Sequence, residues 1–226
     1  MRRAKIVCTM GPAVDSPEKV RELIAAGMNM ARLNLSHGGH PEHQARMDRV
    51  REAAKEVGVP IAILVDLQGP KIRLGRFANG PHELSRGDIF TITTDEISGT
   101  KDRVGTTYKG LPGDCKKGDR ILIDDGKVTV EVVEVKGNDV VTKCIEPGPV
   151  SNNKGINKQG GGLTAPALTA KDMEDIKTAM SFQADYVAVS FPKNATDMEM
   201  ARQLANVAGE PYKHKPGLIA KIERAE

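Results

Sequence analysis

The chain has few aromatic residues and little net charge, and each shortage argues against a class of partner. Phenylalanine, tyrosine and tryptophan make up 3% of its 226 residues, and tryptophan is absent. The sequence therefore lacks the stacking platforms of proteins that bind single-stranded nucleic acid. The 33 basic and 30 acidic residues leave a net charge of +3, which does not indicate a polyanion-binding surface. We expect no nucleic-acid partner.

Cysteine is also scarce, because it occurs only at Cys8, Cys115 and Cys144, without the CxxC spacing of zinc and redox sites. Separated thiols in an odd number suit a reducing cytosol better than a disulfide-stabilised fold. No apolar run is long enough for a transmembrane helix, and the apolar stretch after Met-Arg-Arg is too short for a signal peptide. We expect a cytoplasmic protein without a membrane partner.

The most informative stretch is an unbroken apolar run at residues 61–65, which ends in Asp66. Its β-branched content is typical of a strand that is covered on both faces, as in a parallel sheet. A Gly-Pro pair then ends the strand, and Lys71 and Arg73 follow. An acidic residue at the carboxyl end of a buried strand, with two cations just beyond it, is typical of the active-site edge of an α/β barrel or sheet.

Strand and helix patterns alternate on both sides of the middle of the chain. We expect strands near residues 5–9, 28–35, 61–66, 185–190 and 218–222. Helix patterns follow from Ser16 to Gly27, from Pro41 to Val57, from Thr169 to Phe182 and from Asn194 to Ala208. This spacing predicts βαβ units and a parallel sheet. Since about five strands do not close an eight-stranded barrel, the sequence is interpreted as cut.

The second expected strand places polar residues on one face. Arg32, Asn34 and Ser36 alternate with apolar residues, and a strand has a side-chain period of two. The pattern alone also fits a half-solvated antiparallel strand, but the flanking helices favour a parallel, covered one. An inward-facing Arg32 then needs an anionic partner. The next residue, His37, would by itself more often be a surface residue.

Between residues 70 and 165 the sequence becomes all-β. Short β-rich runs are joined by turn sequences such as Asp125-Gly126, and no helical periodicity is present. The glycine- and asparagine-rich stretch at residues 151–165 is interpreted as a returning linker, and Gly160 to Gly162 as a hinge rather than a phosphate loop. We expect a small β-barrel or sandwich, residues 70–165, inserted between two parts of a β/α framework, residues 1–69 and 166–226.

Near the end of the sequence, Lys221 and Glu223 stand two residues apart and hence on one face of the last expected strand. A Lys-x-Glu pair is usually a solvated ion pair. At the carboxyl end of a barrel strand it becomes a candidate for an active site.

Eight segments, in this order, resemble the N-terminal half of a pyruvate kinase: KIVCTMGPA, GMNMARLNLSHG, VDLQGPKIR, LIDDGKV, SNNKGIN, LTAPALTAKD, VAVSF and IAKIERAE. The pattern is most similar to the bacterial kind with DLQGPKIR and SNNKGIN. The resemblance implies an α/β fold, a (β/α)8 TIM-type barrel that is interrupted after its third strand by a mobile all-β lid. It also implies phosphoryl transfer from phosphoenolpyruvate to ADP, giving pyruvate and ATP in glycolysis, and a homotetramer for the intact enzyme.

The resemblance also implies roles for single residues. Arg32 would hold the transferring phosphoryl group, and Lys221 would lie beside that group. Glu223 would be one of two carboxylate ligands of Mg2+ (or Mn2+), an ion that prefers one or two carboxylates plus substrate oxygens. The nucleotide phosphates would face His37, Arg73 and Lys154. The monovalent-cation pocket would consist of Asn34, Ser36, Asp66 and the carbonyl group of Leu67.

Two departures from the family pattern affect these expectations. Potassium-requiring members have a glutamate in place of Lys71 and Thr-Lys in place of Leu67-Gln68, so the Lys71 ammonium could substitute for K+, and we expect K+ not to be required. The Ala-Arg-Gly-Asp motif, with the second metal carboxylate, is absent from the sequence. We therefore expect this chain alone to be an inactive fragment. The alternatives are another phosphoenolpyruvate- or enolate-handling barrel, such as a lyase, and a truncated, non-catalytic protein that binds nucleotide or metal.

Overall fold

The computed structural model describes residues 3–223, which divide into two compact units. Residues 3–70 and 167–223 form the first, here called the α/β unit, and residues 71–166 form the second, here called the β unit. Each has its own cluster of buried apolar side chains, so each is described by itself. Residues 224–226, the end of the IAKIERAE segment, lie outside the described residues.

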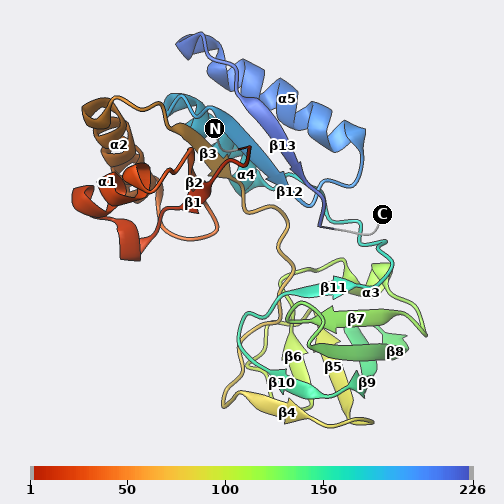
Figure 1. Cartoon of the computed structure of the whole chain (residues 1–226). Helices are drawn as coiled ribbons and strands as arrows, with labels where there is room; N and C mark the ends of the chain where they lie inside the picture. Colours follow the sequence, from red (N-terminus) through yellow and green to blue (C-terminus); the bar gives the residue numbers. More distant parts are fainter. Residues whose placement is uncertain (1–2, 224–226) are drawn as a thin grey trace. The chain divides into compact units, whose positions relative to one another are not determined.

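The α/β unit is built on a parallel sheet of five strands in the order β1-β2-β3-β12-β13, which curls like half of a barrel (Figure 1). The strands are β1 (Val7–Thr9), β2 (Met30–Asn34), β3 (Ala62–Asp66), β12 (Tyr186–Ser190) and β13 (Gly217–Lys221). The parallel α/β architecture agrees with the expectation from the alternating patterns. The first two strands are shorter than predicted: their expected outer residues belong to the adjoining loops.

Four helices join these strands: α1 (Pro17–Ala25), α2 (His40–Val57), α4 (Ala170–Ser181) and α5 (Ala195–Gly209). Their ends follow the capping residues of the sequence. The Ser16 side chain accepts a hydrogen bond from the Lys19 amide, and Gly58 ends α2 at φ 73°. Thr169 and Asp172 form a reciprocal capping box at α4. Two short 3-10 turns, η1 (Pro12–Val14) and η2 (Glu210–Tyr212), complete the unit.

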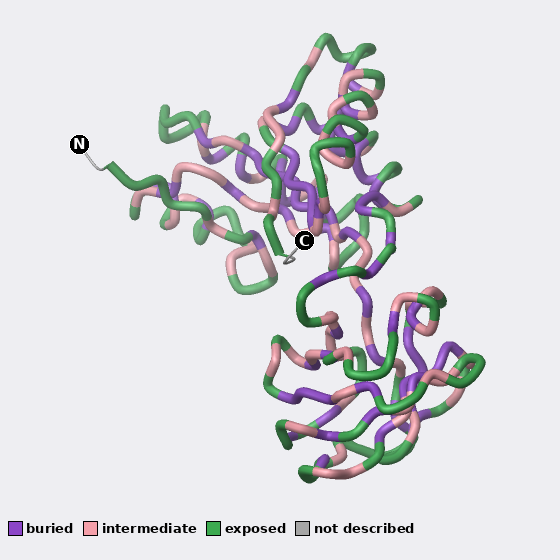
Figure 2. Tube along the Cα trace, turned by 90° about the vertical axis from the view of Figure 1, so that its right-hand side faces the viewer, coloured by how far each residue is buried: buried purple, intermediate pink, exposed green. Residues whose placement is uncertain are grey.

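Strand β2 places apolar and polar residues on opposite faces of the sheet. In β2, Ala31 and Leu33 are fully buried, while Arg32 and Asn34 are partly exposed. The apolar side chains of the strands share one core with those of the helices, and buried residues are concentrated along the sheet (Figure 2). Because the helices cover the apolar face, the polar residues of β2 lie on the opposite face of the sheet.

The β unit contains a six-stranded sheet in the order β11-β7-β8-β9-β5-β6 and a two-stranded sheet of β10 and β4. Its strands are β4 (His82–Leu84), β5 (Ile89–Thr93), β6 (Arg103–Gly105), β7 (Arg120–Ile123), β8 (Val128–Lys136), β9 (Asp139–Glu146), β10 (Gly148–Val150) and β11 (Ile156–Lys158). Most neighbours are antiparallel, but β5 and β6 are parallel. A four-residue helix, α3 (Leu111–Asp114), is too short to show helical periodicity in the sequence.

The turn between β7 and β8 adopts an unusual backbone conformation. Asp124 and Asp125 have φ values of 52° and 59°, and Gly126 follows at 88°. Left-handed conformations favour glycine, and among other residues they favour aspartate and asparagine. The Asp-Asp-Gly sequence therefore suits this turn, which joins the strands with Ile123 opposite Val128.

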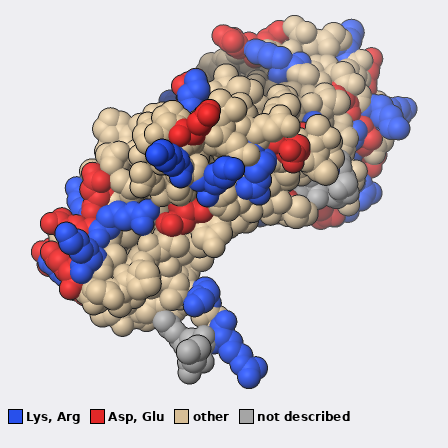
Figure 3. Space-filling model, turned by 90° about the horizontal axis from the view of Figure 1, so that it is seen from above, with Lys and Arg blue, Asp and Glu red and all other residues tan. Residues whose placement is uncertain are grey.

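Acidic and basic side chains are mixed over the face of the molecule seen in Figure 3. Within residues 3–223, every helix is too short or too polar to span a membrane.

Candidate functional site

The carboxyl ends of four neighbouring strands of the α/β unit bring charged and hydroxyl side chains together. Arg32 comes from β2, Asp66 from β3, Ser190 from β12 and Lys221 from β13. Since these strands are parallel and adjacent, their ends lie along one edge of the sheet, where α/β enzymes place their catalytic groups.

Asp66 is the centre of this cluster. It is 2% exposed, and its Oδ2 accepts a hydrogen bond from Arg32 Nε at 2.7 Å and lies 2.5 Å from Arg32 Nη2. Its other oxygen, Oδ1, lies 3.1 Å from Lys221 Nζ. A buried carboxylate is stable only when it is paired and hydrogen-bonded, and here two cations supply that pairing. The anionic partner that the sequence required for Arg32 is Asp66.

Lys221 links the buried acid to the surface. Its Nζ also donates to Ser190 Oγ at 2.8 Å and lies 3.3 Å from Glu223 Oε1. The side chains of Lys221 and Glu223 are 30% and 34% exposed. A ligand in solution can therefore reach both groups, whereas it cannot reach Asp66.

Two hydroxyl groups, neither of them predicted from the sequence, complete the cluster. Ser190 Oγ donates to the Leu67 carbonyl oxygen at 2.7 Å, and Thr9 Oγ1 accepts a hydrogen bond from Arg32 Nη1 at 2.8 Å. A single serine or threonine carries no spacing pattern that marks it. The only sequence signal that could have marked these two residues is their position, because each is the last residue of its strand.

The residues assigned to the monovalent-cation pocket lie near one another, but several of their oxygens already have partners. Asn34 is opposite Asp66 in the β2–β3 pairing, and Asn34 Oδ1 accepts a hydrogen bond from the Ser36 amide at 3.1 Å. The Leu67 carbonyl accepts from Ser190, as described above. His37 follows in the loop, and its carbonyl oxygen lies 2.8 Å from His43 Nε2.

The other predicted residues belong to the β unit. Arg73 Nη1 donates to the Asn153 carbonyl at 2.5 Å, and Lys154 Nζ lies 3.0 Å from Asp124 Oδ2. Lys127 and Lys154 both donate to Asp124, and these hydrogen bonds hold the pKa of its carboxyl group below the ordinary value. Lys71 is the first residue of this unit. Asp124 lies in the LIDDGKV segment, but it was not among the residues predicted for the site.

The structure offers few side chains that could bind a metal ion. Among residues 3–223 there is no group of three or more His, Cys, Asp and Glu side chains that could hold a metal ion. Mg2+ is usually held by one or two carboxylates plus substrate oxygens, so a single accessible carboxylate at the strand ends, Glu223, fits the chemistry of that ion.

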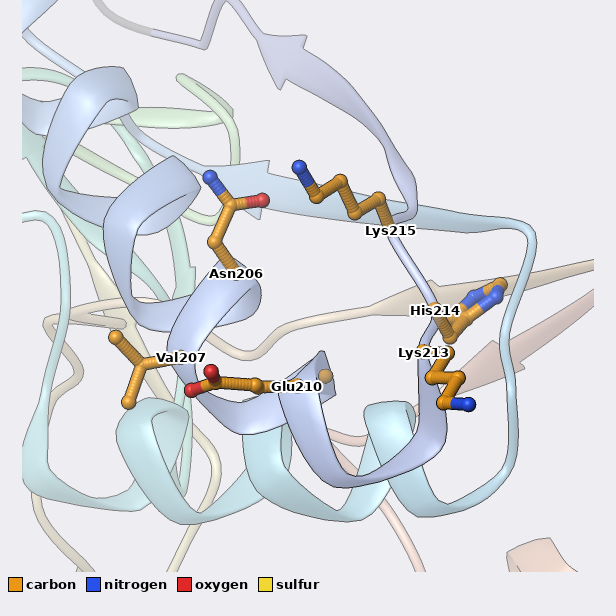
Figure 4. A pocket seen from close by; sticks show the side chains of 7 residues that line it. Asn206, Val207, Glu210, Lys213, His214 and Lys215 are labelled. Atoms are coloured by element: carbon orange, nitrogen blue, oxygen red, sulfur yellow. The ribbon is translucent and has the colours of Figure 1, made fainter.

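The described residues of the α/β unit line at least two hollows. One, of about 380 Å³, lies between the loop that follows β2 and the first turns of α4. The other, of about 740 Å³, is lined by the end of α5 and the segment before β13, and Figure 4 shows Lys215 extending toward the helix that carries Asn206. The larger hollow lies at the amino end of β13, so it is at the opposite end of that strand from Lys221.

A family model described as "Pyruvate kinase, barrel domain" matches residues 1–226. The chain belongs to the pyruvate kinase family. Pyruvate kinase of Corynebacterium glutamicum is 47% identical over 225 residues, which cover 100% of this chain and 46% of that protein. Pyruvate kinase II of Salmonella typhimurium is 50% identical over 228 residues, with 100% of this chain and 47% of that protein covered.

The match confirms the resemblance that the eight sequence segments indicated, and pyruvate kinase is an enzyme of EC 2.7.1.40 type. The pyruvate kinase of Haemophilus influenzae, 48% identical over 228 residues, is aligned over the same share of its length, 47%. The chain thus spans about half the length of the curated pyruvate kinases that it matches.

Proposed function

We propose that this chain contributes the phosphoenolpyruvate-binding part of a pyruvate kinase active site, which transfers a phosphoryl group to ADP and yields pyruvate and ATP in glycolysis. One observation carries the proposal: Arg32 and Lys221 both pair with the buried Asp66 at the carboxyl ends of parallel strands, and Glu223 lies beside Lys221. Phosphoryl transfer depends on positioned cations more than on covalent chemistry, and this cluster offers two.

Arg32 would bind the phosphoryl oxygens. A guanidinium group has five N–H groups. The Nε and Nη1 groups donate hydrogen bonds to Asp66 and Thr9, and Nη2 is ion-paired with Asp66. Two N–H groups, one on each terminal nitrogen, are then left for a ligand. Because Asp66 and Thr9 fix the plane of the guanidinium group, these two donors would be in place before the substrate arrives.

Lys221 would stabilise negative charge on the substrate. Its three ammonium donors face Asp66, Ser190 and Glu223. The contact with Glu223 is the longest and the most exposed of the three, so it is the one that a substrate oxygen would replace. Glu223 would then serve as a carboxylate ligand of Mg2+ (or Mn2+), an ion that neutralises charge on phosphate oxygens when it is bound.

The K+ requirement is proposed to be absent. Asp66 is the one carboxylate in the expected monovalent-cation pocket, and it is already paired with two cations of the chain. Lys71 stands where potassium-requiring members have a glutamate, so its ammonium would add the positive charge that K+ otherwise supplies. Lys71→Glu is then expected to make activity dependent on added K+. Strong stimulation of the unaltered enzyme by K+ would contradict this proposal.

The β unit is proposed to act as a mobile lid on a complete (β/α)8 barrel, with residues 1–69 and 166–226 in the barrel and residues 70–165 in the lid. In this arrangement Arg73 and Lys154, together with His37, would face the nucleotide phosphates. The homotetramer and the cytoplasmic location that the family resemblance implies are part of the same proposal.

The test is pyruvate formation from phosphoenolpyruvate and ADP with Mg2+ in potassium-free buffer. It is run on the 226-residue chain and on the longest polypeptide that carries this sequence. We expect turnover by the longer polypeptide, loss of turnover in its Lys221→Met variant and none by the 226-residue chain. Turnover by the 226-residue chain would show that the second metal carboxylate is dispensable or comes from another copy. If the longer polypeptide forms no pyruvate but still binds ADP and Mg2+, the non-catalytic alternative is favoured.

A further inference from the structure

The loop that follows β2 is held in place by two helices rather than by its own strand alone. This loop, residues 35–40, carries Ser36 and His37 and leads into α2. The Leu35 carbonyl accepts a hydrogen bond from Lys171 Nζ of α4 at 2.9 Å. The other end of the loop is held at His40, whose Nε2 lies 2.7 Å from Oδ1 of Asp175, which is also in α4.

Lys171 and Asp175 form an ion pair across one turn of α4. Lys171 Nζ donates to Asp175 Oδ2 at 2.5 Å, and the two residues are four apart, the spacing that places side chains on the same helical face. The Asp175 side chain is 1% exposed and has cationic or N–H partners on both oxygens. A carboxylate buried to this degree is stable only with such partners. The buried Asp175 therefore holds Lys171 and His40 in position.

The loop has a third attachment from its own helix. His43 is 2% exposed, and its Nε2 donates to the His37 carbonyl. Burial lowers the pKa of the His43 imidazole, which favours the neutral tautomer with one N–H. The loop is therefore tied at Leu35, His37 and His40, and the 380 Å³ hollow lies among these attachments.

The strand-end charges and the loop are held by largely different contacts. Arg32 and Lys221 each pair with Asp66 and are placed by paired strands. Residues 35–40 bond to the strands through the Leu35, Ser36 and His37 amides and are held in addition by side chains of α4 and α2. A change in Lys171 should therefore move the loop and leave the positions of the strand-end cations nearly unchanged.

We propose that Lys171 and Asp175 are positioning residues that hold the loop at residues 35–40 in the geometry needed to bind the nucleotide phosphates. The inference deepens the proposed function, on which it rests for the role of His37. Lys171 acts through the Leu35 carbonyl, and Asp175 acts through Lys171 and His40. Neither residue contacts the reacting groups.

The test compares Lys171→Met with a matched control, Lys177→Met, in the longest polypeptide that carries this sequence. Lys177 lies on the same helix and pairs with Glu174, but both side chains are 64% exposed, so their pairing contributes little. In Lys171→Met we expect KM for ADP to rise about tenfold while kcat changes by less than about twofold, because a charged hydrogen bond to the loop is lost. Lys171→Arg, which retains donors, should restore most of the affinity, and Lys177→Met should match the unaltered enzyme.

A second measurement follows the loop without using activity. Hydrogen exchange at the Ser36 and His37 amides, which bond to Asn34, should become about tenfold faster in Lys171→Met. Amides of the β2–β3 pairing should keep their rates. Equal acceleration in β2 and β3 would indicate a general loss of stability and would overturn the proposal, as would unchanged exchange at Ser36 and His37.

The two measurements separate the two proposals. If the unaltered polypeptide has no turnover, the proposed function fails, and hydrogen exchange still decides whether Lys171 holds the loop. If the polypeptide is active but Lys171→Met keeps its KM for ADP, the positioning role fails and the proposed function stands.

Discussion

Replacement of Arg32 by methionine should reveal how strongly the strand-end cluster depends on charge pairing. Removing one partner of a buried ion pair destabilises a protein by about 3–5 kcal/mol. Here Asp66 keeps Lys221 at 3.1 Å, and the Arg32 side chain is 28% exposed, so part of the charge is still compensated and part was already screened by water. We expect Arg32→Met to lower the free energy of unfolding by about 2 kcal/mol.

Urea unfolding followed by circular dichroism at 222 nm measures this loss. The signal reports the α/β unit, because α1, α2, α4 and α5 lie in it and the described part of the β unit has only the four-residue α3. The control is Lys19→Met. Lys19 pairs with Glu22, and these side chains are 53% and 63% exposed, so we expect a change below about 0.5 kcal/mol.

A double variant identifies the cause. If the loss in Arg32→Met comes from an underpaired carboxylate, then Asp66→Asn in the same chain should recover part of it, with an interaction energy of at least about 1 kcal/mol. The reasoning is refuted if Arg32→Met is no more destabilising than Lys19→Met, or if the two effects at Arg32 and Asp66 simply add.

Three further predictions concern the rest of the chain. Iodoacetamide at pH 8 should modify the partly exposed Cys8 of the folded chain and spare Cys115 until urea is added, because burial raises the pKa of the Cys115 thiol to about 11, as mass spectrometry can show. Gly58→Ala should lower the urea midpoint by an amount equivalent to about 1 kcal/mol, because residue 58 has a left-handed φ of 73°. Lys154→Met should raise the pKa of Asp124, which NMR can follow. In the unaltered chain the lowered pKa of Asp124 stabilises the fold at pH values above the ordinary aspartate pKa, and this stabilisation is lost as the pH falls through the pKa of the folded state.

Each of these predictions has a result that contradicts it. Equal alkylation of Cys8 and Cys115 in the folded chain would mean that Cys115 is accessible. An unchanged midpoint in Gly58→Ala would mean that the end of α2 adapts without strain. A constant pKa of Asp124 in Lys154→Met would assign its shift to Lys127 alone.

The sequence predicted the α/β unit better than the β unit, for physical reasons. Helices with a long apolar stripe and clear caps, such as the one that begins after Ser16, were placed to within one or two residues. Strands of three residues, including β4 and β10, are too short to show an alternating pattern, and their pairing depends on contacts far along the chain. Local propensity carries no information about such contacts.

The same distinction applies to the candidate site. The alternation in β2 indicated that Arg32 faces the polar side of the sheet and needs an anion. The identity of that anion follows from the pairing of β2 with β3 in the structure. The contact of Lys221 with Ser190 likewise depends on the register of β12 and β13. Register is set by packing over the whole sheet, so Ser190 and Thr9 became visible only in the structure.

The insertion of the β unit has a consequence for the order in which the chain folds. Tyr186 of β12 pairs with Leu64 of β3, and every residue of the β unit lies between them in the sequence. Closing such a long loop is entropically unfavourable while the loop is flexible, and pairings over long sequence separations slow folding. A β unit that folds first would replace most of the flexible loop with a compact body. The sheet of the α/β unit would then close late, and slow folding of the inserted strands would delay assembly of the cluster around Asp66.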